Sequence, residues 1–390
     1  MAKPVADDAE LKTSNKKKYI LWGVGLLLLL GIIGAIVGGI FAVRAARSRD
    51  EPPAFRGVSF TPWGSDVAGS ARSRASIAAM MDANVNVVAL NTFHFLRDAD
   101  DVSTITLDVS TEGPNNYSTS DDGLVEGMRY IQSQGMQVFF KPNLDLRTGE
   151  WRATIPASPE FFSIYKDWIV GRAVLAEAEG ATVFSIGTEM NGAQTDEDAW
   201  RDIIQAVRGV YGGTLVYSAN HDAYRDVKFW DALDMIGIDA YFPLTDNDER
   251  EPSKRAMEKK WASLGKDIAS FRDSEVLTDK RVMFAEAGYQ SATGATTASG
   301  HEAGSNQGNE QLEVNVKLQA EAYSALLGMM GSHRFKWWEG AFFWNWEVSP
   351  RANEAEFNSW TPQGKPALEV MTEYYEEWAE DESNWTNSVQ

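Results

Sequence analysis

Two glutamates stand directly after short, almost wholly apolar stretches of the chain. Glu189 lies in "VFSIGTEMNG" (183–192) and Glu286 lies in "FAEAGYQS" (284–291). Two carboxyl groups about 5–5.5 Å apart can hydrolyse a glycosidic bond with retention, one as proton donor and one as nucleophile. Being like charges, they also push one pKa upward, which keeps the donor protonated near neutral pH. Taken singly, Glu189 also suits the first turn of a helix and Glu286 a salt bridge at a rim, so the elements around them must decide.

A catalytic pair needs a fold that brings the two segments together. After residue 56 the chain repeats a short β-rich run, a loop and an amphipathic helix. Eight strands alternating with eight helices predict an α/β fold, a closed (β/α)8 TIM barrel. An open doubly wound sheet is the alternative, but "GVSFTPWGSD" (57–66) is a poor match to its Gly-rich phosphate loop. The predicted strands are 57–60, 85–90, 137–141, 182–186, 214–218, 235–240, 281–285 and 341–344. The predicted helices are 71–83, 121–134, 159–179, 196–210, 226–232, 253–273, 310–331 and 365–378.

The loops that follow the carboxyl ends of the strands carry the chemistry in such a barrel. Glu189 and Glu286 follow the fourth and seventh predicted strands, and Tyr241, near the end of the sixth, is expected to orient a nucleophilic carboxylate by a hydrogen bond. Amides for sugar hydroxyls and tryptophans for the apolar faces of sugar rings complete a carbohydrate site. The candidate substrate-binding residues are Asn143, Asn220, Trp63, Trp344 and Trp346. Trp344 and Trp346 are expected to point to opposite sides, with Trp344 toward the site.

The remaining polar residues predict neither a metal centre nor a cofactor. The chain has no Cys and only four His, none of them paired at zinc-ligand spacing. We expect His94 and His221 to be structural or peripheral, and Asp239 to be a buried acid with its partners satisfied.

The net charge limits the partners of the chain. Of a formal −20 over 390 residues, the first 50 residues hold eight Lys/Arg and four Asp/Glu, which leaves −24 for residues 51–390. Such a surface repels phosphate backbones, so we expect no nucleic-acid partner. A neutral or cationic substrate is the better fit.

An apolar segment near the N-terminus predicts a membrane anchor. "YILWGVGLLLLLGIIGAIVGGIFAV" (19–43) has no charge and is long enough to cross a bilayer as a helix. It is longer than the apolar region of a cleavable signal, which favours an uncleaved span after a short tail (1–18). Flanking charges are nearly balanced, but the short tail, the acidic domain and the sequons at Asn116 and Asn384 favour a single-pass type II protein with its domain outside. The predicted organisation continues with a linker (44–56), the barrel (57–378) and an acidic tail (379–390).

Six ordered blocks of sequence resemble glycoside hydrolase family 113 of clan A. The similarity spans residues 55–378. It is carried by "WRATIP" (151–156), "FFSIYKDWI" (161–169), "FSIGTEMNG" (184–192), "FWDALDMIGIDAYFPL" (229–244), "FAEAGYQS" (284–291) and "GAFFWNW" (340–346).

The resemblance implies a barrel that hydrolyses β-1,4-mannosidic bonds in mannan, glucomannan or manno-oligosaccharides with retention and without a cofactor. It implies Glu189 as acid/base, Glu286 as nucleophile, Tyr241 as the residue that steadies Glu286, and a Trp of the "FFWNW" block beneath the sugar. Many clan A enzymes carry Asn where this chain has Thr188, so the sugar 2-hydroxyl needs another partner, for which Asn143 and Asn220 are candidates.

Three alternatives stay open at this point. The substrate could be another β-glycan, or the reaction could be transfer to a second sugar in place of water. The barrel could also be a membrane-anchored glycan-binding protein without catalysis, although retention of both glutamates and Tyr241 argues against that. The sequence does not determine an oligomeric state.

Overall fold

The computed structural model describes residues 52–62, 68–107, 119–297 and 312–389. Within these ranges, no helix combines the length and the apolar character needed to cross a membrane. The predicted span (19–43), its preceding tail and Trp63 lie outside the described residues.

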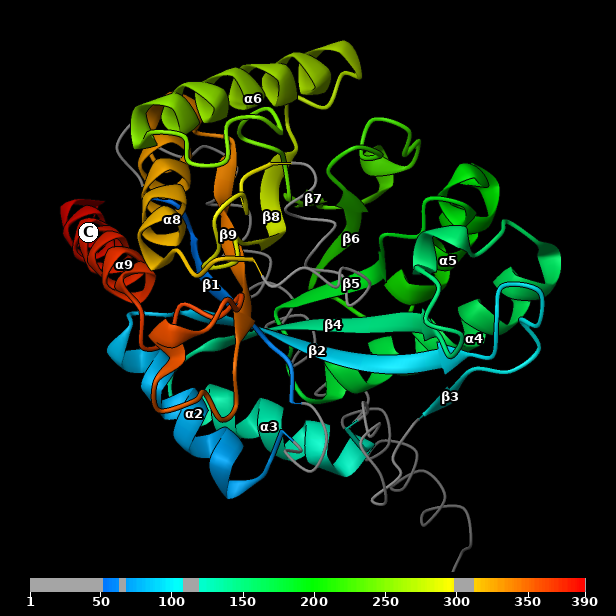
Figure 1. The fold of residues 1–390 in the computed structure, drawn as a ribbon. Coiled ribbons are helices and arrows are strands. Elements are labelled where there is room, and N and C mark those ends of the chain that lie inside the picture. The colour runs from blue at the N-terminus through cyan, green and yellow to red at the C-terminus, as the bar shows by residue number, and fades with distance from the viewer. Residues whose placement is uncertain (1–51, 63–67, 108–118, 298–311, 390) are drawn as a thin grey trace, which may run out of the picture. The chain divides into compact units, whose positions relative to one another are not determined.

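Eight parallel strands close into a barrel, which confirms the predicted fold class for the main part of the chain (Figure 1). β1 (Phe55–Phe60) pairs with both β2 (Val87–Leu96) and β9 (Trp338–Trp346), and this double pairing closes the sheet. The other barrel strands are β4 (Gln137–Leu146), β5 (Val183–Thr188), β6 (Thr214–Asn220), β7 (Met235–Asp239) and β8 (Arg281–Ala287). A short antiparallel strand, β3 (Thr106–Leu107), is added to the outer end of β2 and was not predicted.

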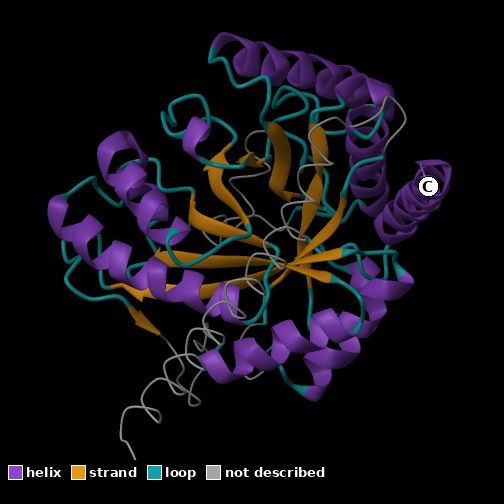
Figure 2. Cartoon of the chain, turned by 180° about the vertical axis from the view of Figure 1, so that it is seen from behind, coloured by secondary structure: helices purple, strands orange, loops and turns teal. Residues whose placement is uncertain are grey.

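Helices surround the strands on the outside (Figure 2). They are α2 (Ala71–Asp82), α3 (Asp121–Ser133), α4 (Pro159–Ala178), α5 (Glu197–Arg208), α6 (Lys254–Ser274), α8 (Val316–Met330) and α9 (Pro366–Val389). A serine hydroxyl that accepts a backbone amide caps the N-terminus of four of them, and this explains where those helices begin. The capping residues are Ser70, Ser120, Ser158 and Ser253.

Three predicted boundaries are wrong. The helix predicted at 226–232 is only a 3-10 turn, Trp230–Ala232, because so short a segment gains too few helical hydrogen bonds to persist. β1 begins at Phe55, inside the predicted linker. The predicted tail (379–390) is helical as far as Val389, since no Gly or Pro ends α9 earlier.

Apolar side chains form two layers, one inside the barrel and one between the strands and the helices. Because successive side chains of a strand point to opposite faces, each strand contributes to both layers. The ring of Phe342 lies 5.1 Å from that of Phe139 and 5.7 Å from that of Phe55, so these rings pack the barrel interior. The inner layer consists of Phe55, Val87, Ala89, Phe139, Val183, Val216, Met235, Met283, Ala285 and Phe342.

Three barrel strands carry one extra residue near their carboxyl ends. Such a bulge interrupts the alternation, so the side chains beyond it point to the opposite face from the one that a regular strand would give. The extra residues fall between Ser185 and Thr188 in β5, between Phe284 and Glu286 in β8, and between Phe343 and Trp346 in β9. These irregularities decide which side chains enter the barrel at the end where the candidate residues lie.

His94 generates a testable prediction about stability. Its side chain is buried with the ring 5.0 Å from that of Trp168, and burial, reinforced by Arg172 and opposed by Asp121, lowers its pKa from 6.5 to about 3. As the pH falls below 6.5, the unfolded chain binds a proton that the folded chain does not. Folded-state stability is therefore lost as the pH falls from 6.5 toward 3, by up to about 1.4 kcal/mol per pH unit from this group.

We expect urea unfolding of His94→Gln to show a shallower decline in stability over that pH window than the wild type. Carboxyl groups titrate in both proteins and cancel in the comparison. Parallel declines in the two proteins would show that His94 does not make this contribution.

Candidate active site

Glu286 is held at both carboxylate oxygens. The bulge in β8 makes Ala285 and Glu286 point inward in succession, so that Glu286 enters the barrel above the apolar layer. The Tyr241 hydroxyl donates to Oε2 at 2.7 Å, and the Lys141 ammonium donates to Oε1. Two donors on a largely buried carboxylate stabilise its charged form and fix its orientation. The hydrogen bond expected from Tyr241 is therefore present.

Lys141 joins Glu286 to a second acid, Asp239. Lys141 stands two residues after Phe139 on β4 and shares its inward direction, and its Nζ lies 3.3 Å from both oxygens of Asp239 on β7. Both side chains are completely buried. Asp239 is thus the buried, paired acid that the sequence predicted.

One buried ammonium cannot balance two buried carboxylates. Burial raises the pKa of Asp239 well above its ordinary value, with Lys141 opposing and Glu286 adding to the rise. Burial alone would lower the pKa of Lys141, but Asp239 and Glu286 outweigh it and the pKa is raised. One cation is therefore shared by two carboxyl groups, and burial favours the neutral form of Asp239.

Glu189 is similarly enclosed but less well paired, with its side chain 13% exposed against 10% for Glu286. It follows β5 with a left-handed φ of 52°, and its amide donates to the carbonyl of Ser218 at 2.7 Å. Its carboxylate accepts one hydrogen bond, from the Trp151 indole at 3.3 Å, and lies 3.8 Å from the Arg152 guanidinium. Burial raises the pKa of Glu189; Arg152 opposes this and Glu286 adds to it. A carboxyl group with a raised pKa, together with one whose two oxygens are both held by donors, is the asymmetry that acid catalysis by one and nucleophilic attack by the other require.

Arg152 is positioned by residues from β4. Its Nε donates to Asp145 at 2.7 Å and its Nη1 to the Oδ1 of Asn143 at 3.4 Å. The Asn143 amide nitrogen donates in turn to Asn91 and to the Lys141 carbonyl, both at 3.2 Å. Asn143 is buried and engaged on both amide atoms, so the structure places it behind Arg152 and in a supporting position.

The other predicted binding residues have different surroundings. Asn220, at the end of β6, donates to Asn191 at 3.4 Å and so lies beside the Glu189 loop. Trp344 is half-buried near the end of β9. Trp360, which the sequence did not single out, meets the Tyr241 ring edge-on at 5.6 Å.

The prediction that Trp346 binds substrate is wrong. Its side chain is buried in the outer layer, and its indole donates to the Ser76 hydroxyl on α2 at 3.0 Å. Strand alternation alone would place Trp344 and Trp346 on the same face, because residues two apart share a face of a regular strand. It therefore does not explain the expectation that they point to opposite sides. The bulge in β9 instead turns Trp346 outward, beside Phe60.

Lys141, Trp151 and Arg152 were given no role from the sequence. A lysine within the apolar run "VFFKP" (138–142) was the available signal for Lys141. Trp151 and Arg152 lie at a 3-10 turn, Arg152–Thr154, whose contact with Glu189 depends on tertiary structure. The turn is fixed to the Glu189 loop, since the Gly192 amide donates to the Ala153 carbonyl at 2.9 Å.

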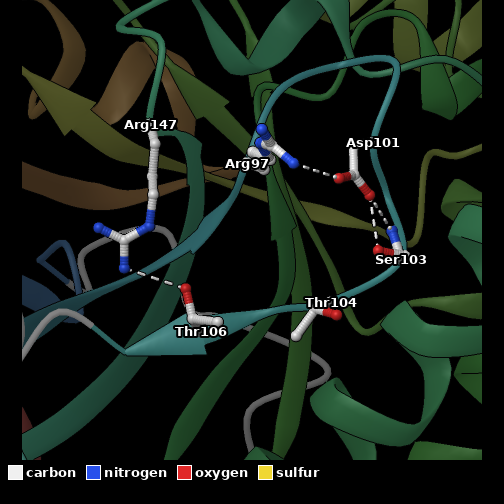
Figure 3. Close-up of a pocket in the computed structure, with 6 residues that line it drawn as sticks. All are labelled: Arg97, Asp101, Ser103, Thr104, Thr106 and Arg147. Carbon is white, nitrogen blue, oxygen red and sulfur yellow. Dashed lines mark hydrogen bonds and ion pairs between the residues drawn. The ribbon is translucent and has the colours of Figure 1, made fainter.

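A separate hollow of about 390 Å³ lies at the outer end of the β2–β4 pair (Figure 3). Arg97 pairs with Asp101 at 3.5 Å, and Arg147 donates to the Thr106 hydroxyl at 3.0 Å. The residues that line the hollow are Arg97, Asp101, Ser103, Thr104, Thr106 and Arg147. Neither candidate glutamate is among them, and the chemistry proposed below does not use this hollow.

The buried cluster of Lys141, Asp239 and Glu286 generates a testable prediction about stability. We expect Lys141→Met to destabilise the protein by about 3–5 kcal/mol, because it leaves buried carboxyl groups without a cation. Asp239→Asn added to Lys141→Met should recover part of that loss, with a coupling of about 0.5–3 kcal/mol. Urea unfolding of the two single variants and the double variant measures this coupling, and additive losses would contradict a shared cluster.

Comparisons with known proteins agree with the geometry. A model of glycoside hydrolase family 113 matches residues 67–365. The family 113 β-mannanase AaManA from Alicyclobacillus acidocaldarius, solved in complex with ManMIm, is 26% identical, with a TM-score of 0.70 over 85% of this chain and 100% of that one. A second family 113 structure, a β-1,4-mannanase, is 25% identical, with a TM-score of 0.70 over 83% of this chain and 99% of that one.

A family 5 mannosidase from Rhizomucor miehei is only 11% identical, with a TM-score of 0.55 over 86% of this chain and 95% of that one, and shares the fold. No curated protein sequence matches the chain. The family resemblance carried by the six sequence blocks is confirmed: the chain belongs to glycoside hydrolase family 113.

Proposed function

We propose that the protein is a retaining glycoside hydrolase that cleaves β-1,4-mannosidic bonds in mannan, glucomannan or manno-oligosaccharides. The observation that carries the proposal is the contrast between the two glutamates. Glu286 has donors on both oxygens, whereas burial raises the pKa of Glu189. The choice of mannan rests on the family 113 β-mannanases that resemble the chain at 25–26% identity.

The proposed reaction has two steps. Glu286 attacks the anomeric carbon while Glu189 gives its proton to the departing oxygen, which forms a covalent mannosyl-enzyme. Glu189 then accepts a proton from water as the water attacks the same carbon and releases Glu286. Tyr241 and Lys141 would hold Glu286 in place through both steps.

Aromatic and amide side chains near the two glutamates would bind the sugar. Trp151 is half exposed while its indole nitrogen contacts Glu189, so its ring offers an apolar face beside the proton donor. Trp344 remains a proposed platform for the sugar. Thr188 is fully buried, whereas Asn191 is partly exposed, so contacts to the sugar hydroxyls are proposed for Asn191 and for Asn220, which donates to it.

We also propose that residues 19–43 anchor the enzyme in a membrane as a type II protein, on the strength of the uncharged apolar sequence alone. The full chain should stay with the membrane fraction after an alkaline carbonate wash, and a chain lacking residues 1–50 should not. Protease should reach the barrel from the outer side of intact cells. Release of the full chain by the wash would contradict an anchor.

The two glutamates should respond differently to removal. Glu189→Ala should slow mannan hydrolysis by about 10²–10⁴-fold. With aryl mannosides whose leaving group needs no protonation, it should still form the mannosyl-enzyme at close to the wild-type rate, and only the release step should be slow. Glu286→Ala should be inactive on both. Azide should restore activity to both variants, with a β-mannosyl azide as the product of Glu189→Ala and an α-mannosyl azide as the product of Glu286→Ala. NMR distinguishes the two products. Two fully active alanine variants, or rescue products of the reverse configurations, would contradict the assignment.

Arg152 gives a signed pH prediction. Its charge lowers the pKa of Glu189, and activity requires protonated Glu189, so activity falls as the pH rises through that pKa. In Arg152→Met the pKa of Glu189 should rise further, and the alkaline limb of the pH profile of kcat/KM should move to higher pH. Arg152→Lys keeps the charge and should leave the limb near its wild-type position. A matched control is Arg97→Met, in the separate hollow, which should not move it.

An alkaline limb that stays in place in Arg152→Met would show that Glu189 is not the proton donor that limits activity at high pH.

A further inference from the structure

One buried ammonium serves two carboxyl groups in the mouth of the barrel. The Lys141 Nζ donates to Glu286 and lies 3.3 Å from both oxygens of Asp239. The Lys141 and Asp239 side chains have no exposed surface, and the Glu286 side chain is only 10% exposed. Solvent therefore cannot supply a counter-charge if either carboxylate is lost, and the protein must supply it.

The three side chains come from strands that meet at this point. Asp239 on β7 pairs directly with Glu286 on β8, and on its other side with Asn220 on β6. Lys141 reaches both acids from β4, across the barrel interior. The charged groups that act on Asp239 are Lys141, Glu286 and Glu189. Lys141 is the cation among them, and it contacts both Asp239 and Glu286.

The first step of the proposed reaction changes the charge of Glu286. An oxygen of Glu286 forms a bond to the anomeric carbon, the bond from that carbon to the departing oxygen breaks, and the proton of Glu189 moves to the departing oxygen. Glu286 is then a neutral ester. The negative charge then lies on Glu189, whereas Asp239 is the remaining carboxyl group in contact with Lys141. A buried ammonium without a charged partner in contact is strongly unfavourable.

We propose that Asp239 is the reserve counter-ion of Lys141. It becomes charged and pairs with the ammonium when Glu286 becomes neutral on forming the covalent bond. The proposal rests on the double displacement described under the proposed function. As the ester forms, Asp239 releases its proton to water by way of the mouth of the barrel, where the neighbouring Glu286 side chain is 10% exposed. It takes a proton back when water releases the sugar and Glu286 regains its charge. Asp239 touches neither the sugar nor the reacting atoms, so it is a positioning residue that acts through Lys141.

The proposal predicts opposite effects on the two steps. Asp239→Asn preserves the shape of the neutral acid in the free enzyme but cannot become charged. The ester and the transition state leading to it should be destabilised, so that adduct formation slows about tenfold or more. Release of the sugar restores the charge of Glu286, so that step should proceed at the wild-type rate or faster. A purely structural role for Asp239 would slow both steps.

The test traps the adduct on the full-length protein. A dinitrophenyl β-mannobioside fluorinated at carbon 2 of the reacting ring slows both steps, and intact-protein mass spectrometry follows adduct formation. Removal of excess reagent and addition of mannotetraose then give the rate of adduct release. Glu354→Gln is a matched control, because Glu354 is a buried acid 3.8 Å from the buried Lys365, outside the proposed cluster. It should leave both rates unchanged.

The outcomes separate this inference from the function on which it rests. If the wild type forms no adduct, the retaining mechanism fails. If the wild type forms an adduct and Asp239→Asn matches it in both rates, or is slower in both, the reserve role of Asp239 is wrong. Slower formation with unimpaired release supports it.

An infrared measurement supports the test without relying on the kinetics of the Asp239→Asn variant. In Glu189→Gln, the proton donor contributes no carboxyl band, and the dinitrophenyl group leaves without protonation. Adduct formation in that protein should remove the absorption of one protonated carboxyl group as Asp239 becomes charged, and the loss should be missing in Glu189→Gln/Asp239→Asn. A difference spectrum without that loss in Glu189→Gln would overturn the proposal.

Discussion

The active-site arrangement depends on the buried ammonium of Lys141, which two carboxyl groups share. A charge without exposed surface is tolerable only with close partners, and here the partners are Glu286 and Asp239. The inward-facing positions of β4 provide the place: Phe139 packs the floor of the barrel, Lys141 follows two residues later, and Asn143 follows it toward the rim. The same strand therefore supplies the apolar floor, the cation and the support for Arg152.

The surroundings of the two glutamates differ because their strands place them at different positions. The bulge in β8 turns Glu286 into the barrel, where Lys141 and Tyr241 fix it. Glu189 instead lies just beyond the end of β5, next to a turn that carries Trp151 and Arg152. Both carboxylates are largely enclosed, but Glu286 is held by strong donors and Glu189 by weaker ones. Two side chains of the same chemical type thus have different surroundings, and burial raises the pKa of Glu189.

The barrel could be predicted from the sequence because the alternation of strands and helices is a local pattern. The positions of Glu189, Glu286 and Tyr241 at the ends of strands followed from that pattern as well. Side-chain direction did not follow, because bulges depend on the pairing between strands and leave no clear signal in the residues themselves. Trp346 shows the consequence: the predicted sugar contact packs on α2 instead.

Two further contacts could not be predicted because they join residues that are far apart in the sequence. Lys141 and Asp239 are far apart in sequence, so neither residue alone indicates a shared charge. The contact of Arg152 with Glu189 likewise depends on how one loop folds against another. The extension of α9 through its acidic end was missed for a different reason. A run of acidic residues suggested a solvated tail, but Glu382 pairs with Arg56 of β1 at 2.9 Å.

The central claim is that Glu286 attacks the sugar and is released again, so that the configuration at the anomeric carbon is inverted twice. Proton NMR of the first product formed from mannotetraose, recorded before the free sugar equilibrates, tests this directly. The account predicts that the new reducing end appears first as the β anomer. A new reducing end that appears first as the α anomer would contradict it.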